Sequence, residues 1–187
     1  DEFAKTMHQC KTRHYLALME KGELPLRPGV ERLLNEARGK GYRLAIATTT
    51  TPENVTWLLK NTLGEESIDW FEVIAAGDIV PAKKPAPDIY TWAMGKMNLN
   101  PDQCIAFEDS ENGIKSSTAA GLKTIITENG YTHKHPMQGA LIRLDNMGEP
   151  DAPFTVLGGN SHGKSWLDIE LVETLFADQK TPETSNS

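Results

Sequence analysis

Three groups of polar residues stand next to short apolar runs and could together bind a phosphate. Thr48 and Thr49 follow one apolar run, Lys84 lies just before a proline, and Glu108 and Asp109 follow another run. A hydroxyl and free backbone N–H groups before a helix make an anion site, and phosphate is its usual occupant. A lysine neutralises charge that builds up as phosphate is transferred. Neighbouring carboxylates suit Mg²⁺, which takes one or two of them with water and phosphate. The pattern therefore predicts a phosphate–Mg²⁺ site.

Each group also has a simpler structural explanation. Thr48 and the hydroxyls after it would serve equally well to cap the next helix. A Lys-Lys pair such as Lys83 and Lys84 is commonly a solvated part of a loop, although the prolines that follow restrict where Lys84 can point. Asp109 would also serve as a helix cap. Glu108 has no such capping role and loses hydration at a strand end, so the acidic pair favours a metal over a cap.

Strands and helices alternate along the chain and explain how distant groups could meet. Apolar periodicity and flanking Gly and Pro residues predict helices over residues 30–38, 52–63, 88–97, 111–120 and 166–176. Short apolar runs predict strands over residues 42–47, 73–76, 104–107, 123–127 and 141–144. This order predicts an α/β fold, a Rossmann-like parallel sheet with helices on both faces. Ligands in such folds bind at the carboxyl ends of the strands, where the three polar groups stand.

The remaining segments suggest a division of the chain into three parts. Residues 2–21 have helical apolar spacing, and the Pro/Gly-rich residues 22–29 form a link. We therefore expect the end of a helical domain over 1–24, an α/β core over 25–178 and a disordered tail over 179–187. Residues 145–165 are rich in Gly, Pro and Asn, which predicts a loop.

Composition limits the class of protein and its partners. The 187 residues are 39% hydrophobic and 24% charged, which excludes collagen-like, coiled-coil and wholly disordered chains. A net charge of −7 disfavours nucleic acid, and the absence of a long apolar run disfavours a membrane-spanning helix. Cys10 and Cys104 are too few for a disulfide framework, so we expect a reducing compartment.

The same residues resemble the haloacid dehalogenase superfamily of phosphatases and phosphomutases. The resemblance rests on the order and spacing of three motifs, in residues 44–48, 84–88 and 107–113, and covers about residues 2–145. Longer runs around these motifs are similar to the CbbY branch of the superfamily. That branch is associated with the Calvin cycle and dephosphorylates xylulose 1,5-bisphosphate, an inhibitor of Rubisco.

The resemblance implies a role for each residue of the predicted site. Thr48 would bind the transferring phosphate with help from the Thr49 backbone. Lys84 would hold the phosphate and balance the charge of the nucleophile. Asp109 would coordinate Mg²⁺, and Glu108 would do so directly or through water. The site would then belong to a Mg²⁺-dependent phosphatase that acts on a phosphorylated sugar.

The resemblance also implies a helical cap domain that closes over the site. Residues 3–21 would form the last helix of this cap. His8, Lys11 and Arg27 are candidates for contacts with a sugar bisphosphate from the cap side. The oligomeric state is left open, with a monomer as the expectation, and bacterial cytosol and plastid stroma both fit a reducing compartment.

One part of the family pattern is absent from the sequence. The first motif of the family, Asp-x-Asp-Gly-Thr on the first strand, would supply the nucleophile and the general acid, and no Asp-x-Asp occurs here. We therefore expect an N-terminally truncated chain that lacks the first strand and most of the cap. The complete protein is predicted to be a phosphatase, and this chain alone is predicted to be inactive.

Three other interpretations share part of the pattern. A phosphomutase such as β-phosphoglucomutase has all three motifs and differs in its cap contacts. A pseudoenzyme would keep ligand binding and lack the nucleophile. A receiver-like signalling domain also places acids, a hydroxyl and a lysine around Mg²⁺, but there the acids come first along the chain and the lysine last.

Overall fold

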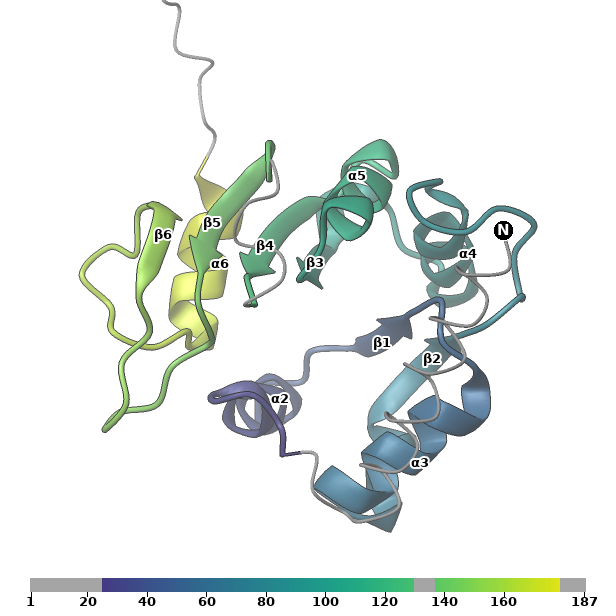
Figure 1. Ribbon diagram of the computed structural model, residues 1–187, viewed down its shortest axis with the longest axis horizontal. Helices are drawn as coiled ribbons and strands as arrows, with labels where there is room; N and C mark the ends of the chain where they lie inside the picture. The colour runs from purple at the N-terminus through teal and green to yellow at the C-terminus, as the bar shows by residue number, and fades with distance from the viewer. Residues whose placement is uncertain (1–24, 130–136, 179–187) are drawn as a thin grey trace, which may run out of the picture.

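The computed structural model describes residues 25–129 and 137–178 (Figure 1). Its helices are α2 (Val30–Gly39), α3 (Pro52–Leu63), α4 (Asp88–Met97), α5 (Glu111–Ala119) and α6 (Ile169–Ala177), with short 3₁₀ helices η1 (Glu65–Trp70) and η2 (Pro101–Gln103). Its strands are β1 (Leu44–Ala47), β2 (Phe71–Ala75), β3 (Ile105–Glu108), β4 (Lys123–Thr127), β5 (Ala140–Leu144) and β6 (Val156–Gly159). The predicted alternation of strands and helices is confirmed, with bounds that shift by up to three residues.

The strands pair as two sheets within the described residues. Strands β1 and β2 form a parallel pair, and β3, β4 and β5 form a parallel group to which β6 adds an antiparallel edge. At the carboxyl ends, Ala47 is in register with Ala75, and Glu108 is in register with Ile126. The chain positions that follow the parallel strands therefore lie at one end of each sheet, whereas β6 runs in the opposite direction.

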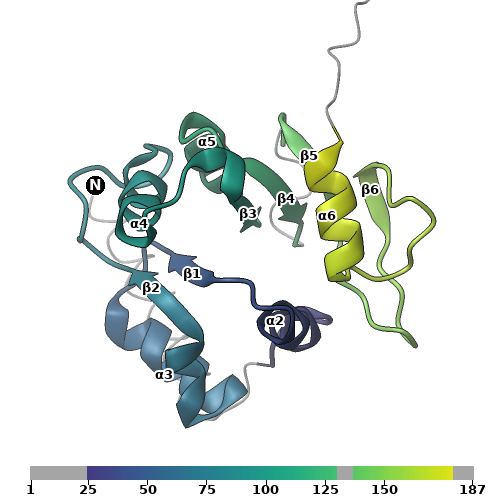
Figure 2. The same ribbon diagram turned by 180° about the vertical axis from the view of Figure 1, so that it is seen from behind.

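Helices cover both faces of the strands, as predicted (Figure 2). Alternate residues of a strand face opposite sides, and neighbouring residues of β1 accordingly pack differently: Ile46 against the α3 cluster and Ala47 against the α4 cluster. In β4, Ile125 lies in the core shared with α2 and α6, whereas Ile126 packs in the cluster that contains Ile114 of α5. Helices α4 and α5 are in contact on one face, and α2 and α6 on the other.

Strand β6 corrects the prediction of a loop over residues 145–165. Its four residues, Val156–Gly159, end in two glycines and carry no alternating apolar pattern that a sequence reading can use. The strand exists because β5 offers it a free edge, with Ile142 opposite Gly159. Gly159 has φ +91°, and a Cβ there would lie 2.8 Å from the Leu141 carbonyl, so the pairing requires a glycine.

Helix α6 begins at Ile169 rather than at the predicted Trp166. The Asp168 carboxylate accepts a hydrogen bond from Leu171 N at 2.8 Å and so caps the helix. The segment before α6 is tied to α2 by Arg32, whose guanidinium donates to the carbonyls of Leu167 and Gly148 at 3.1 and 2.7 Å.

Two predicted regions lie outside the described residues and stay predictions. These are the cap helix within residues 1–24, which includes His8 and Lys11, and the tail over 179–187. Within residues 25–129 and 137–178, no helix combines the length and apolar character that crossing a bilayer demands.

Replacement of a leucine at the centre of the larger sheet tests the packing of the core. Leu144 on β5 is fully buried, so Leu144→Ala should lower the free energy of unfolding by about 2–5 kcal/mol. Leu157 on the edge strand is 41% exposed, so Leu157→Ala should change it by no more than about 0.5 kcal/mol. Urea unfolding followed by circular dichroism measures both, and equal effects would contradict this assignment of the core.

Candidate functional site

Lys84 ties together the carboxyl ends of two strands that are not hydrogen-bonded to each other among the described residues. Its Nζ donates to the Ala47 carbonyl at the end of β1 at 2.9 Å, and it forms an ion pair with Glu108 at the end of β3. The side chains of Lys84 and Glu108 are only 13% and 7% exposed. Two of the predicted motifs therefore meet in one nearly buried ion pair, and the third ends at Thr48, the residue after Ala47.

Thr48 is left available because another residue caps the helix. The side chain of Thr51 caps α3, accepting from Asn54 N at 3.4 Å. Thr48 Oγ1 instead accepts from Thr50 N at 3.2 Å, which holds the hydroxyl in a tight turn just beyond β1. Thr48 N donates to the Ala75 carbonyl at 2.9 Å and so continues the pairing with β2. The hydroxyl is thus fixed at the strand end, and Thr49 is exposed beside it.

Asp109 is likewise not needed as a helix cap. Ser110 caps α5, its hydroxyl accepting from Gly113 N at 3.1 Å. The Asp109 side chain is exposed, and Asn129 Nδ2, just beyond β4, donates to its Oδ2 at 3.4 Å. An exposed carboxylate at a strand end, held from the neighbouring strand, is suited to binding a cation.

Glu108 is held by a tyrosine that the sequence reasoning did not single out. The Tyr90 hydroxyl, from α4, donates to Glu108 Oε1, the oxygen that also pairs with Lys84. Burial and the neighbouring Glu108 carboxylate raise the pKa of Tyr90 above its usual value of about 10, so the phenol keeps its proton near neutral pH. On the other side, a Cβ at Gly113 would lie 1.9 Å from Glu108 Oε2. The carboxylate is therefore enclosed between a phenol and a glycine.

The arrangement fits Mg²⁺ in an open site rather than in a closed protein cage. Within the described part of the chain, no group of three or more His, Cys, Asp or Glu side chains could hold a metal. Mg²⁺ commonly uses one or two carboxylates and completes its shell with water and substrate phosphate. Asp109 offers exposed oxygens for this purpose, whereas one oxygen of Glu108 already accepts two hydrogen bonds.

Arg27 lies at the same end of the larger sheet, with its guanidinium bound within the protein. It donates to the carbonyl and hydroxyl of Thr127 at 3.0 and 2.9 Å, and to the carbonyls of Glu128 and Asp145. These contacts fasten the start of α2 to the ends of β4 and β5. A contact of Arg27 with a sugar bisphosphate stays a prediction.

The residues Thr48, Lys84, Tyr90, Glu108 and Asp109 are called the Lys84 cluster below. Two other acidic residues that follow strands form ion pairs with residues outside this cluster. Asp78, after β2, forms an exposed ion pair with Lys83 at 2.7 Å, so the two lysines of the Lys-Lys pair have different surroundings. Glu128, after β4, is buried and pairs with Arg143 of β5, whose Nε donates at 2.6 Å. Both acids are thus neutralised by partners outside the predicted site.

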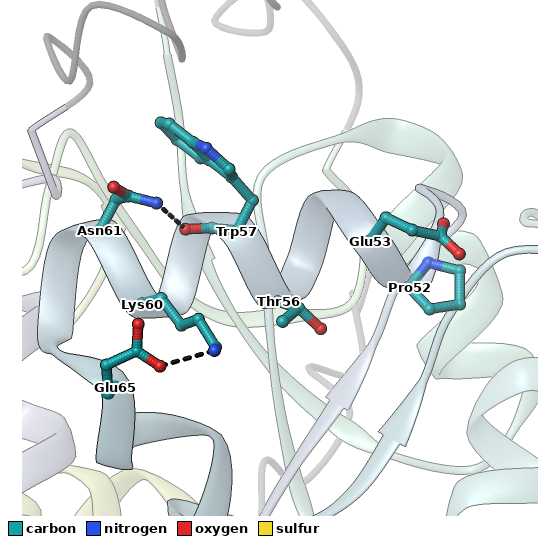
Figure 3. A pocket seen from close by; sticks show the side chains of 7 residues that line it. All are labelled: Pro52, Glu53, Thr56, Trp57, Lys60, Asn61 and Glu65. Atoms are coloured by element: carbon teal, nitrogen blue, oxygen red, sulfur yellow. Dashed lines mark hydrogen bonds and ion pairs between the residues drawn. The ribbon is translucent and has the colours of Figure 1, made fainter.

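Residues of α3 and η1 line a surface hollow (Figure 3). It measures about 460 Å³ and is lined by Pro52, Glu53, Thr56, Trp57, Lys60, Asn61 and Glu65. Three of its polar side chains have partners within it, since Lys60 pairs with Glu65 at 2.5 Å and Asn61 Nδ2 donates to the Trp57 carbonyl at 2.8 Å. None of the residues predicted for phosphate or metal binding lines it.

Comparison with known proteins agrees with the motifs that meet at Lys84. Residues 2–121 match the haloacid dehalogenase-like hydrolases. The chain belongs to this family. The chain is 39% identical over 169 residues to "Protein CbbY, plasmid" from Cupriavidus necator, covering 90% of the chain and 66% of that protein.

Solved structures of CbbY are similar to this chain. Two crystal structures of CbbY from Rhodobacter sphaeroides, one in complex with phosphate and one of a mutant in complex with xylulose-(1,5)bisphosphate, match with a TM-score of 0.69. Each is 42% identical, over 76% of this chain and 63% of the CbbY chain. The resemblance to the superfamily and to its CbbY branch is therefore confirmed. The chain spans just under two thirds of the length of these relatives.

Replacement of Gly113 by alanine tests whether the position of the Glu108 carboxylate contributes to stability. Gly113→Ala should lower the free energy of unfolding by about 1–3 kcal/mol, because the new Cβ displaces a buried, paired carboxylate. Gly95→Ala is the matched control, since Gly95 also lies within a helix and a Cβ there meets no atom within 4 Å. The control should gain about 0.5–1 kcal/mol from the better helix former. Urea unfolding distinguishes them, and equal stabilisation of both variants would show that Glu108 moves without cost.

Proposed function

We propose that the protein to which this chain belongs is a Mg²⁺-dependent phosphatase that acts on a phosphorylated sugar, specifically a sugar bisphosphate such as xylulose 1,5-bisphosphate. The observation that supports the proposal is the contact of one lysine with both Ala47 and Glu108, because Thr48 and Asp109 are the next residues along the chain. The likeness to CbbY, of which a mutant binds xylulose-(1,5)bisphosphate, supports the choice of substrate. The two cysteines of this chain fit a protein from a reducing compartment. Bacterial cytosol and plastid stroma are both reducing.

Each residue of the cluster has a part in this reaction. The Thr48 hydroxyl and the backbone N–H of Thr49 would bind oxygens of the transferring phosphate. Lys84 would neutralise the charge that develops on these oxygens. Asp109, with Glu108 directly or through water, would hold Mg²⁺, which when bound lowers the charge that a nucleophile meets at the phosphate.

The nucleophile is proposed to lie outside these 187 residues, which contain no Asp-x-Asp. Strands β1 and β3 each pair on one side only within the described residues, and Lys84 joins their carboxyl ends. A strand carrying an aspartate between them would present its carboxylate beside Lys84. Attack of that carboxylate on phosphorus would form an aspartyl phosphate as the bond to the sugar oxygen breaks and that oxygen takes up a proton. Water would then release inorganic phosphate and restore the carboxylate.

Removal of the Asp109 charge tests the proposed metal site. In the full-length protein, Asp109→Asn should lower kcat for xylulose 1,5-bisphosphate by about 100-fold or more, because a charged group that stabilises the transition state is lost. Asp69→Asn is the control, since Asp69 is exposed in η1, which leads into the amino end of β2. It should leave turnover unchanged. Release of inorganic phosphate is the measurement, and full activity of Asp109→Asn would refute the role of Asp109.

The 187-residue chain alone should show no turnover, because its sequence supplies no nucleophile. Phosphate release from xylulose 1,5-bisphosphate by the purified chain should match a no-protein blank at saturating Mg²⁺. Mg²⁺-dependent turnover that Asp109→Asn abolishes would contradict this expectation. In the full-length protein, conversion of a hexose 1-phosphate to its 6-phosphate without phosphate release would instead identify a phosphomutase, and no reaction with either substrate would identify a pseudoenzyme.

A further inference from the structure

Tyr90 contacts the proposed catalytic and metal-binding residues but has no role of its own in the proposed reaction. It lies on α4, where it is only 9% exposed, and its hydroxyl donates to the same oxygen of Glu108 that Lys84 contacts. Its ring also lies beneath the lysine, with Lys84 Nζ 4.8 Å from the ring centroid and 3.5 Å from the hydroxyl oxygen. One side chain thus contacts both members of the buried ion pair.

The donors and acceptors of this group can be counted. Lys84 carries three N–H donors, which go to the Ala47 carbonyl, to Glu108 Oε1 and, at 3.5 Å, to the Tyr90 hydroxyl oxygen. The phenol of Tyr90 has a single donor, which goes to Glu108. Glu108 is therefore held by two donors, one from Lys84 and one from Tyr90.

We propose that Tyr90 is a positioning residue: its hydroxyl, opposite Gly113, fixes the Glu108 carboxylate, so that Lys84 and the metal-binding acids keep one arrangement. This inference rests on the proposed function for its chemistry. Without the hydroxyl, Lys84 would be the remaining donor that orients Glu108 Oε1, and the carboxylate could turn about that one contact. Hydrogen bonds from neighbouring groups are what orient metal-binding carboxylates in proteins generally.

The matched pair of variants is Tyr90→Phe and Tyr42→Phe in the full-length protein. Tyr42 also donates its hydroxyl to a carboxylate, that of Glu173 at 2.5 Å, and it lies 47% exposed away from the cluster. Both changes remove one tyrosine–carboxylate hydrogen bond and keep the ring. They differ in whether the carboxylate belongs to the cluster.

The first measurement is calorimetric titration with Mg²⁺ alone, and the second is steady-state turnover of xylulose 1,5-bisphosphate. Tyr90→Phe should weaken Mg²⁺ binding by about tenfold and lower kcat by about tenfold or more, the effect usual for groups that orient metal ligands. KM should change little, because the contacts of Thr48 and Lys84 with phosphate remain. Tyr42→Phe should leave all three quantities as in the unchanged protein.

A double variant tests whether Tyr90 acts through Glu108. If it does, Tyr90→Phe should have almost no further effect on Mg²⁺ binding once Glu108→Gln is present, since coupled residues are not additive. Wild-type Mg²⁺ affinity and kcat in Tyr90→Phe, or full additivity with Glu108→Gln, would overturn the proposal. Weakened Mg²⁺ binding in Tyr90→Phe, in a protein whose unaltered form releases no phosphate from sugars, would uphold the positioning role and refute the proposed function.

Discussion

The buried ion pair between Lys84 and Glu108 is the interaction on which the arrangement of the site depends. Burying both charges costs solvation energy, which is offset only when geometry is good and further hydrogen bonds are made. The Ala47 carbonyl and the Tyr90 hydroxyl supply those bonds. Loss of either partner would leave a charge nearly buried without its counterpart, so the ends of β1 and β3 are held at a fixed separation.

The residues that cap helices α3 and α5 are not the residues proposed to bind phosphate or metal. Thr51 caps α3 and Ser110 caps α5, which leaves Thr48 and Asp109 at the strand ends without that task. In both cases the capping residue follows the functional candidate by one to three positions. A strand can therefore end in a ligand-binding residue and still lead into a well-formed helix.

Arginines fasten the part of the fold that lies beyond the site. Arg27 joins the start of α2 to the ends of β4 and β5, and Arg32 joins α2 to the segment before α6. Their partners are mostly backbone carbonyls, which any sequence supplies. Residues 145–168 carry no recognisable motif, yet they are held to the α/β layers by these contacts and by the pairing of β6 with β5.

The sequence by itself determined the order of the α-helices and of strands β1 to β5 within residues 25–178, the bounds of α4 and β4, and the family, because these depend on local periodicity, caps and motif spacing. It also named Thr48, Lys84 and Asp109 as candidates for one site. Only the tertiary structure decided that Lys84 rather than Lys83 is the buried lysine, that Tyr90 holds Glu108, and that β6 forms. These features depend on contacts between residues far apart in the chain, such as Tyr90 with Glu108, and a local pattern carries no information about which distant carboxylate or strand edge will be the partner.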